Sequence, residues 1–179
     1  MASESIEAIR DIEGVIQSGK TIEASRVRNW MRMPSIEVQS VLTDLLLEHS
    51  EKISPPLSME EICHSVESYY KQCLIRNFKN NDRVPNRHIA GYELVRWFKS
   101  LWQDSAVPRL YLERLKGMLR DLYTSGEVPA HELTTAVLEH LFEEQEIQEF
   151  FAEWKIDAQL SDAFSLAKEW GDEHISKSN

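Results

Sequence analysis

The sequence predicts an all-α protein, and three observations lead to this fold class. Apolar residues recur every three or four positions along most of the chain, which is the period of one face of an α-helix. Apolar and polar residues do not alternate over the length of a strand anywhere between turn signals. Prolines, glycines and helix-capping residues divide the pattern, so we expect a helical bundle of about nine helices.

The first 54 residues are expected to form a small N-terminal helical subdomain of three short helices. The first helix carries a stripe of isoleucines and ends before Gly19, which suits the left-handed position after a helix. Pro34 ends the second helix, and Ser35 is placed to cap the third. The prolines at 55–56 then mark the boundary with the rest of the chain.

The second and third helices are joined by a tight turn, which invites a helix-turn-helix interpretation. We expect five polar residues to face outward from the candidate recognition helix: Glu37, Gln39, Ser40, Asp44 and Glu48. A DNA reader presents Arg, Lys, Asn or Gln at such positions, whereas carboxylates are repelled by phosphates. This composition therefore argues against DNA binding by the helix.

Residues 55–171 are expected to form the main helical bundle, followed by a frayed tail at 172–179. Ser58 and Glu61 have the spacing of a capping box, in which each side chain accepts a hydrogen bond from the other residue's backbone N–H. From Leu133 to Trp170, apolar residues recur in steps of three and four, and many are aromatic. We expect this stretch to form the centre of the core, because each large aromatic side chain can bury roughly 150–250 Å².

The two cysteines, Cys63 and Cys73, lie ten residues apart on one expected helix. That spacing is about 15 Å along the helix axis, which is too far for a disulfide between them. We therefore expect free thiols in a reducing, cytoplasmic setting. The first residues lack the pattern of a signal peptide, and no stretch has the roughly 20 apolar residues of a membrane helix.

Charge is unevenly distributed along the chain, whose net charge is −10. Residues 1–70 carry 6 basic and 12 acidic side chains, residues 71–120 carry 11 and 4, and residues 121–179 carry 3 and 14. Either the basic middle segment pairs internally with the acidic C-terminal part, or that acidic part binds a basic partner. General affinity for nucleic acid is not expected, because most of the chain would repel phosphates.

We assign no catalytic residue, cofactor or metal from the sequence. Glu61 and His64 have the Glu-x-x-His spacing of di-iron bundles, but no second such pair accompanies them. His131 and Glu132 begin like a zinc-protease helix, but Thr135 stands where the second histidine ligand is needed. A helical enzyme or regulator of unknown substrate, with a site assembled from residues distant in sequence, is the alternative function.

An acidic helical face is the candidate partner-binding site. Its six glutamates are Glu132, Glu139, Glu143, Glu146, Glu149 and Glu153. No Lys or Arg lies between His131 and Lys155, and a face of this charge speeds the capture of a cationic protein. The same pattern also suits a solvated face that keeps the protein soluble.

Four cations form a candidate anion-binding cluster in or beside the polar connection at 77–87. They are Arg76, Lys79, Arg83 and Arg87. One interpretation is that they hold an RNA backbone or an acidic protein loop; the other is a solvated loop that neutralises carboxylates of the C-terminal part. Nucleic-acid binding through this segment is the third functional hypothesis.

Three stretches near the C-terminus, at 138–143, 150–154 and 163–171, resemble the ending of helical bacterial proteins, some of which are similar to immunity proteins. The resemblance covers about the last quarter of the chain and implies a bacterial protein that neutralises a toxin. The acidic face leads us to expect that the toxin domain is basic and that the protein is not an enzyme. No catalytic motif accompanies it. The oligomeric state and the identity of the partner stay open.

Overall fold

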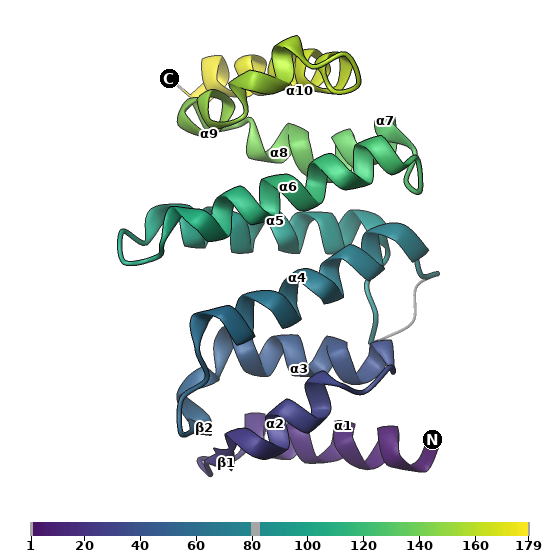
Figure 1. Ribbon diagram of the computed structural model, residues 1–179, viewed down its shortest axis with the longest axis vertical. Helices are drawn as coiled ribbons and strands as arrows, with labels where there is room; N and C mark the ends of the chain where they lie inside the picture. Colours follow the sequence, from purple (N-terminus) through teal and green to yellow (C-terminus); the bar gives the residue numbers. More distant parts are fainter. Residues whose placement is uncertain (1, 80–82, 179) are drawn as a thin grey trace. The chain divides into compact units, whose positions relative to one another are not determined.

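The computed structural model describes residues 2–79 and 83–178, and these residues are almost entirely helical. Within them, the only paired strands are β1 and β2, of two residues each, which confirms the all-α fold class (Figure 1). The described chain divides into an N-terminal unit, residues up to Tyr69 with 83–84, and a C-terminal unit, residues 70–79 with 85–178. None of the described helices is long and apolar enough to cross a membrane.

The border between the units lies within helix α4 (Met59–Arg76), whereas the sequence analysis placed it at Pro55 and Pro56. The prolines precede α4, but the first part of this helix belongs to the N-terminal unit because its side chains bond there. The Tyr69 hydroxyl, for example, donates a hydrogen bond to Ser40 Oγ over 3.0 Å. Both cysteines lie on α4, are buried, and form no disulfide with each other, as expected.

The N-terminal unit is built on the packing of α1 against α3. Its elements are α1 (Ala2–Gln17), β1 (Ile22–Glu23), α2 (Ala24–Met31), α3 (Ile36–Glu48), the 3-10 turn η1 (Ser50–Lys52), β2 (Ile53–Ser54) and the first part of α4. The strands pair in parallel with Ile22 opposite Ile53. They escaped the sequence analysis because two residues are too few to show an alternating pattern. Lys52 Nζ donates to the carbonyls of Val15 and Ile16 at 3.2 and 2.6 Å, where the end of α1 leaves carbonyls without helical partners.

Helix α3 buries two of the five polar residues that were expected to face outward. Ser35 caps α3 as expected, since its Oγ accepts a hydrogen bond from the Val38 N–H. Gln39 and Ser40, however, are buried rather than outward-facing. Gln39 Nε2 donates to the carbonyl of Trp30 at 2.9 Å, and Ser40 Oγ donates to the carbonyl of Arg83. The unit's own chain therefore covers the side of α3 that holds these two residues.

The capping box at the start of α4 is confirmed. The Ser58 N–H donates to Glu61 Oε2 at 3.0 Å, and the Glu61 N–H donates to Ser58 Oγ at 3.2 Å. Glu61 also accepts a hydrogen bond from Arg28 Nε of α2 at 2.6 Å, a contact that joins two helices of the N-terminal unit. The hydrogen bond from Arg28, followed by those from Ser58, lowers the pKa of Glu61 from 4.5 to about 2.

A pH titration of stability tests this carboxylate. Because folding lowers the pKa of Glu61, its stabilising contribution is complete above pH 4.5 and is lost as the pH falls towards about 2. Glu61→Gln removes the titrating group while a glutamine can still complete the capping box. We expect the urea midpoint of the wild type to fall more between pH 6 and pH 2.5 than that of the variant. Equal decreases of the urea midpoint in the wild type and in Glu61→Gln would contradict the lowered pKa of Glu61. Glu51→Gln, which replaces an exposed carboxylate on η1, is the control and should follow the wild type.

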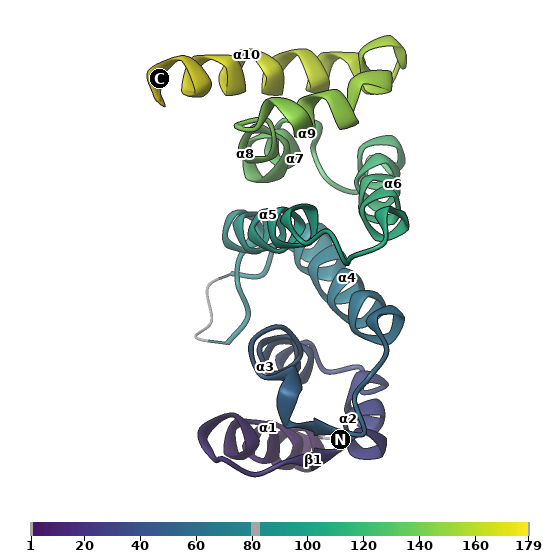
Figure 2. The same ribbon diagram turned by 90° about the vertical axis from the view of Figure 1, so that its left-hand side faces the viewer.

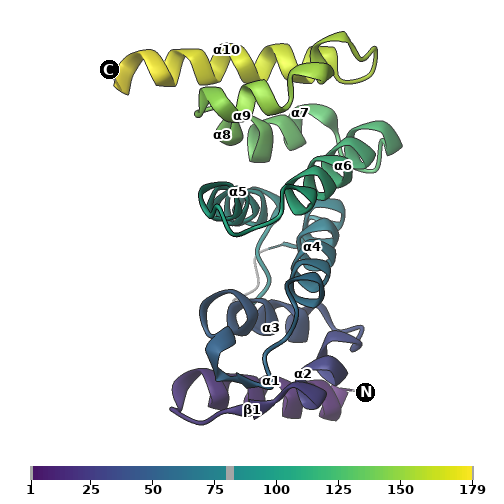
Figure 3. The ribbon, with the colours of Figure 1, turned by 60° about the vertical axis from the view of Figure 1, so that its left-hand side comes forward.

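The C-terminal unit is a layered set of helices that follows the last turns of α4. Its elements are α5 (Arg87–Gln103), α6 (Arg109–Ser125), α7 (Ala130–Leu133), the π-helical turn η2 (Thr134–Leu138), α8 (Glu139–Leu141), α9 (Gln145–Phe150), the 3-10 turn η3 (Ala152–Ile156) and α10 (Ser161–Ser178). The elements α7, η2 and α8 are continuous, and we call them the 130–141 helix. It packs against α5 on one side and α10 on another, and α10 runs across α8 in Figures 2 and 3.

An aromatic cluster fills the core of this unit, as predicted. Phe142, Phe151 and Trp154 are fully buried, and the Phe151 and Trp154 ring centroids lie 4.9 Å apart. Phe164 of α10 meets Phe142 with a centroid distance of 5.1 Å. Trp170 departs from the prediction, because it is only half-buried at the surface.

Helix α10 continues to Ser178, where the sequence analysis expected a frayed tail from residue 172. Gly171, the last residue of the expected bundle, lies inside this helix. The ion pair between Lys168 and Asp172, at 2.5 Å, spans one turn across this position and supports the helix.

Two glycines set the distance between helices in the C-terminal unit. A Cβ atom on Gly91 of α5 would lie 2.5 Å from the carbonyl oxygen of Ala136, and one on Gly171 would lie even closer to the carbonyl oxygen of Phe142. Both neighbours are backbone atoms, which cannot rotate away as a flexible side chain can. Helices α5 and α10 therefore approach the 130–141 helix and its end closely because these two positions carry no side chain.

Alanine substitutions separate this packing role from helix propensity. We expect Gly91→Ala and Gly171→Ala each to lower the free energy of unfolding by about 1–3 kcal/mol, because an added methyl group overpacks the contact. Gly117→Ala is the matched control, since Gly117 lies inside α6 with no neighbour within 4 Å of its Cβ position. Alanine favours a helix over glycine, so this control should gain up to about 1 kcal/mol. Urea denaturation measures the free energy of unfolding of all three variants. Similar changes in Gly91→Ala and Gly117→Ala would contradict the close approach of α5 to the 130–141 helix.

Candidate functional site

The six glutamates of the predicted acidic face differ in whether they are paired within the unit. Three of them are held by cations of the unit itself: Glu132 by Arg87, Glu143 by Lys99 and Glu153 by Lys116. The cations all come from residues 71–120, so internal pairing of the basic and acidic segments is confirmed for these three glutamates.

Lys99 of α5 is the centre of one group of ion pairs, which includes Glu143. Its Nζ lies 3.1 Å from Glu143 Oε2 and 3.3 Å from Glu144 Oε1, and its side chain is mostly buried. His140 Nδ1 lies 3.1 Å from the other oxygen of Glu143. Burial acts to raise the pKa of Glu143, but the hydrogen bonds with His140 and Lys99 outweigh it and lower the pKa. Glu143 therefore stays ionised and joins α5 to the end of the 130–141 helix.

Lys116 of α6 is the centre of another group of contacts, which includes Glu153. Its Nζ contacts Glu153 at 2.6 Å and donates to the carbonyl of Phe150 at 2.8 Å. The same ammonium lies 4.1 Å from the centre of the Phe150 ring, within the range of a cation–π interaction. A neighbouring pair joins Arg120 to Asp157 at 2.8 Å. These cations connect α6 to the segment around η3.

The other three glutamates, Glu139, Glu146 and Glu149, have no ion pair with any residue that the structure describes. Glu146 and Glu149 are exposed on α9, and Glu149 meets only the amide of Gln145, at 3.4 Å. Glu139 is half-buried and lines a groove beside α10. The acidic charge left for a partner therefore lies in two places, on α9 and beside α10.

The four cations of the predicted anion-binding cluster have different surroundings. Arg87 is buried: its Nε donates to the carbonyl of Leu74 at 2.6 Å, and a second nitrogen of its guanidinium bonds Glu132. Arg83 belongs to the N-terminal unit, where it pairs with Glu13 at 2.6 Å. Arg76 lies over the Phe78 ring at 4.8 Å, and Lys79 is exposed.

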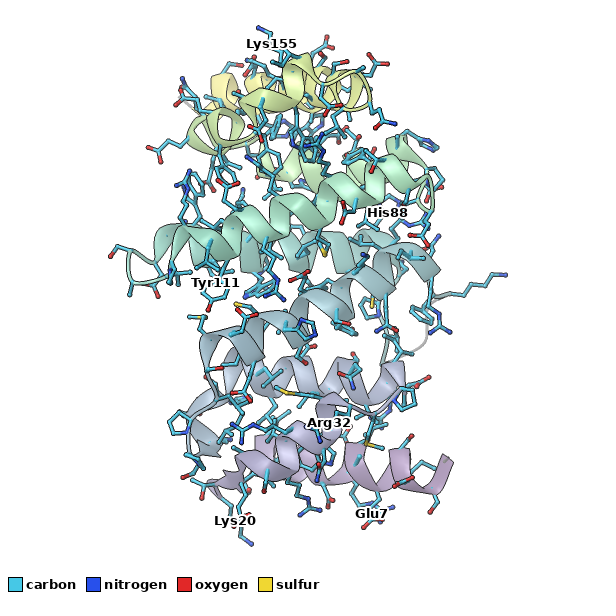
Figure 4. The ribbon with its side chains drawn as sticks, viewed as in Figure 1. Glu7, Lys20, Arg32, His88, Tyr111 and Lys155 are labelled. Atoms are coloured by element: carbon cyan, nitrogen blue, oxygen red, sulfur yellow. The ribbon has the colours of Figure 1, made fainter. Side chains whose placement is uncertain are left out.

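Two grooves open on the C-terminal unit. The α10 groove, of about 290 Å³, lies between the 130–141 helix and α10, and is lined by His131, Thr134, Thr135, Glu139, Leu166, Glu169, Trp170 and Glu173. The lysine-lined groove, of about 480 Å³, lies between α9, η3 and α10, with Lys155 and Lys168 beside Glu149 and Asp172. Lys155 is labelled in Figure 4, where it projects away from the ribbon. Only the α10 groove lacks a lysine or arginine among its described lining residues.

Three cations that pair with carboxylates of the acidic segment were not predicted from the sequence: Lys99, Lys116 and Arg120. The available signal was the basic middle block, which predicted internal pairing in general but could not say which carboxylates it would take. Among the described residues, no group of three or more His, Cys, Asp or Glu side chains is arranged to hold a metal ion. Comparison of the chain with family models, curated proteins and solved structures finds no match in any of the three.

The buried position of Arg87 leads to a prediction about stability. Arg87→Met leaves Glu132 and the carbonyls at the end of α4 without their donor, so we expect the free energy of unfolding to fall by about 2–4 kcal/mol. Arg76→Met replaces an exposed arginine of the same unit and should change the free energy of unfolding by less than about 0.5 kcal/mol. Urea denaturation compares the two. Equal, small effects would contradict the structural role of Arg87.

Proposed function

We propose that this protein is a non-enzymatic, protein-binding protein that captures a basic partner through carboxylates of its C-terminal unit. The observation that supports the proposal is the acidic charge that the unit's own cations leave unpaired. Arg87, Lys99, Lys116 and Arg120 hold five carboxylates of residues 121–179, yet Glu139, Glu146 and Glu149 have no ion pair in the described residues.

Unpaired carboxylates of like charge do not stabilise a fold. Glu146 and Glu149 lie three residues apart on the short helix α9, where like charges repel by some tenths of a kcal/mol. A partner that presents Lys or Arg would relieve this repulsion and gain from long-range attraction as it approaches. The internal pairs keep the helices in place, while the unpaired carboxylates give the surface its charge.

The form of this function that we propose is that of an immunity protein, which neutralises a toxin domain by covering it. The support for this form is the sequence resemblance at 138–143, 150–154 and 163–171. A basic domain that acts on an anionic substrate must expose its cations, and a surface of carboxylates laid over them would exclude that substrate. Nucleic-acid binding is less well supported, because Arg87 is buried and paired with Glu132 and Arg83 is paired with Glu13.

Charge reversal at the three unpaired glutamates tests the proposal. The wild-type protein is first used to isolate its partner from the native host, with identification by mass spectrometry. The triple variant Glu139→Lys, Glu146→Lys and Glu149→Lys should then bind the purified partner at least about tenfold more weakly at low salt, because attraction becomes repulsion. Binding by the wild type should itself weaken as salt is raised from about 50 to about 300 mM.

A matched control reverses three exposed carboxylates of the N-terminal unit, Glu4, Glu7 and Glu51, and so makes the same change in net charge. This control should keep the wild-type affinity within about twofold, since none of these carboxylates belongs to the proposed interface and exposed charges are screened by salt. Equal affinity of both triple variants for the partner, or an isolated partner that is acidic, would overturn the proposal.

A further inference from the structure

The α10 groove has the size and lining of a subsite for one long side chain. Its volume of about 290 Å³ lies just below the range of about 300–1,000 Å³ that is usual for small-molecule pockets. Carboxylates enter from both walls, with Glu139 on the 130–141 helix and Glu169 and Glu173 on α10. Leu166, which is 56% exposed, and Trp170 supply an apolar wall.

A row of partly exposed aromatic side chains adjoins this groove. Tyr92 meets His140 edge-on at a centroid distance of 6.0 Å, His140 meets Trp170 at 5.3 Å, and Trp170 stacks on His174 at 3.6 Å. Trp170 belongs to both the row and the groove. Its neighbours hold the indole in place, so little side-chain entropy remains to be lost when a partner contacts it. Tryptophan and tyrosine at such half-exposed positions are the residue types that dominate protein interfaces.

The charge of the groove indicates which kind of side chain it can bind. The lysine-lined groove contains Lys155 and Lys168, and Lys168 pairs with Asp172, whereas the α10 groove has carboxylates and no lysine or arginine among its described lining residues. A second copy of this chain, with a net charge of −10, would be repelled, and so would a nucleic acid. A cationic side chain is complementary to both the charge and the apolar wall, because Lys and Arg have an aliphatic stem below a charged head.

We infer that the α10 groove receives a lysine or arginine side chain of the basic protein partner, with its stem against Leu166 and Trp170 and its charged head between Glu139 and Glu169. This inference rests on the proposed function and specifies where the partner's cation is held. Thr134 and Thr135 of the π-helical turn η2 also line the groove. Glu146 and Glu149 on α9 then supply attraction at a distance from this subsite.

An NMR titration of the full-length protein tests the subsite without the natural partner. The probe is the peptide acetyl-Gly-Arg-Gly-Arg-Gly-amide, and its counterpart with citrulline in place of arginine has the same shape without the charge. The protein holds five tryptophans, and the indole N–H signal of Trp170 is identified by its loss in Trp170→Phe. At low salt, the arginine peptide should shift this signal and the amides of Glu139 and Glu169 saturably, while the citrulline peptide should not.

Paired variants locate the binding. Glu139→Gln with Glu169→Gln should weaken the peptide about fivefold or more, whereas Glu146→Gln with Glu149→Gln, the same loss of charge on α9, should weaken it less than about twofold. Unchanged positions of the other four indole signals show that each variant is folded. Shifts confined to α9 would overturn the subsite and leave the proposed function standing. Equal NMR shifts with the citrulline peptide, or no shift with the arginine peptide, would also overturn the subsite. The proposed function is decided separately, by the charge-reversal test on the isolated partner.

Discussion

The close approach of helix backbones at Gly91 and Gly171 is the constraint on which the C-terminal unit depends. Gly91 lets α5 approach the carbonyl of Ala136, and Gly171 lets α10 approach the carbonyl of Phe142. The 130–141 helix is thereby held against both α5 and α10. With α10 at this distance, the Phe142 and Phe164 rings pack edge to face, and the α10 groove lies between α10 and the 130–141 helix.

The ion pairs of the unit follow from that packing. Lys99 reaches Glu143 and Glu144 because α5 lies beside the 130–141 helix, and Lys116 reaches Glu153 from α6. Each cation also contacts more than one group, which distinguishes these pairs from isolated surface pairs of little energetic value. The acidic C-terminal sequence thus has two roles, since part of it fixes the helices and the rest stays available at the surface.

Helical periodicity and capping residues were enough to predict the helical class, the aromatic core and the capping box at Ser58 and Glu61, because these depend on residues close in sequence. Other features depend on which helices meet. The burial of Gln39 and Ser40 follows from contacts with Trp30, Tyr69 and Arg83, and no local pattern contains that information. Likewise, charge segregation indicated internal pairing, but only the fold shows that Glu143 is paired while Glu146 is not.

The π-helical turn Thr134–Leu138 has a consequence for how this helix could change over evolution. An α-helix turns by about 100° per residue, so a residue inserted into regular winding would rotate every later side chain by that amount. A π turn instead takes up the extra residue in one wider turn, and the residues after it keep their faces. Deleting one residue here would restore ordinary winding with Glu139 still facing α10, so a one-codon change at this turn would leave the acidic groove and the framework of helices in place.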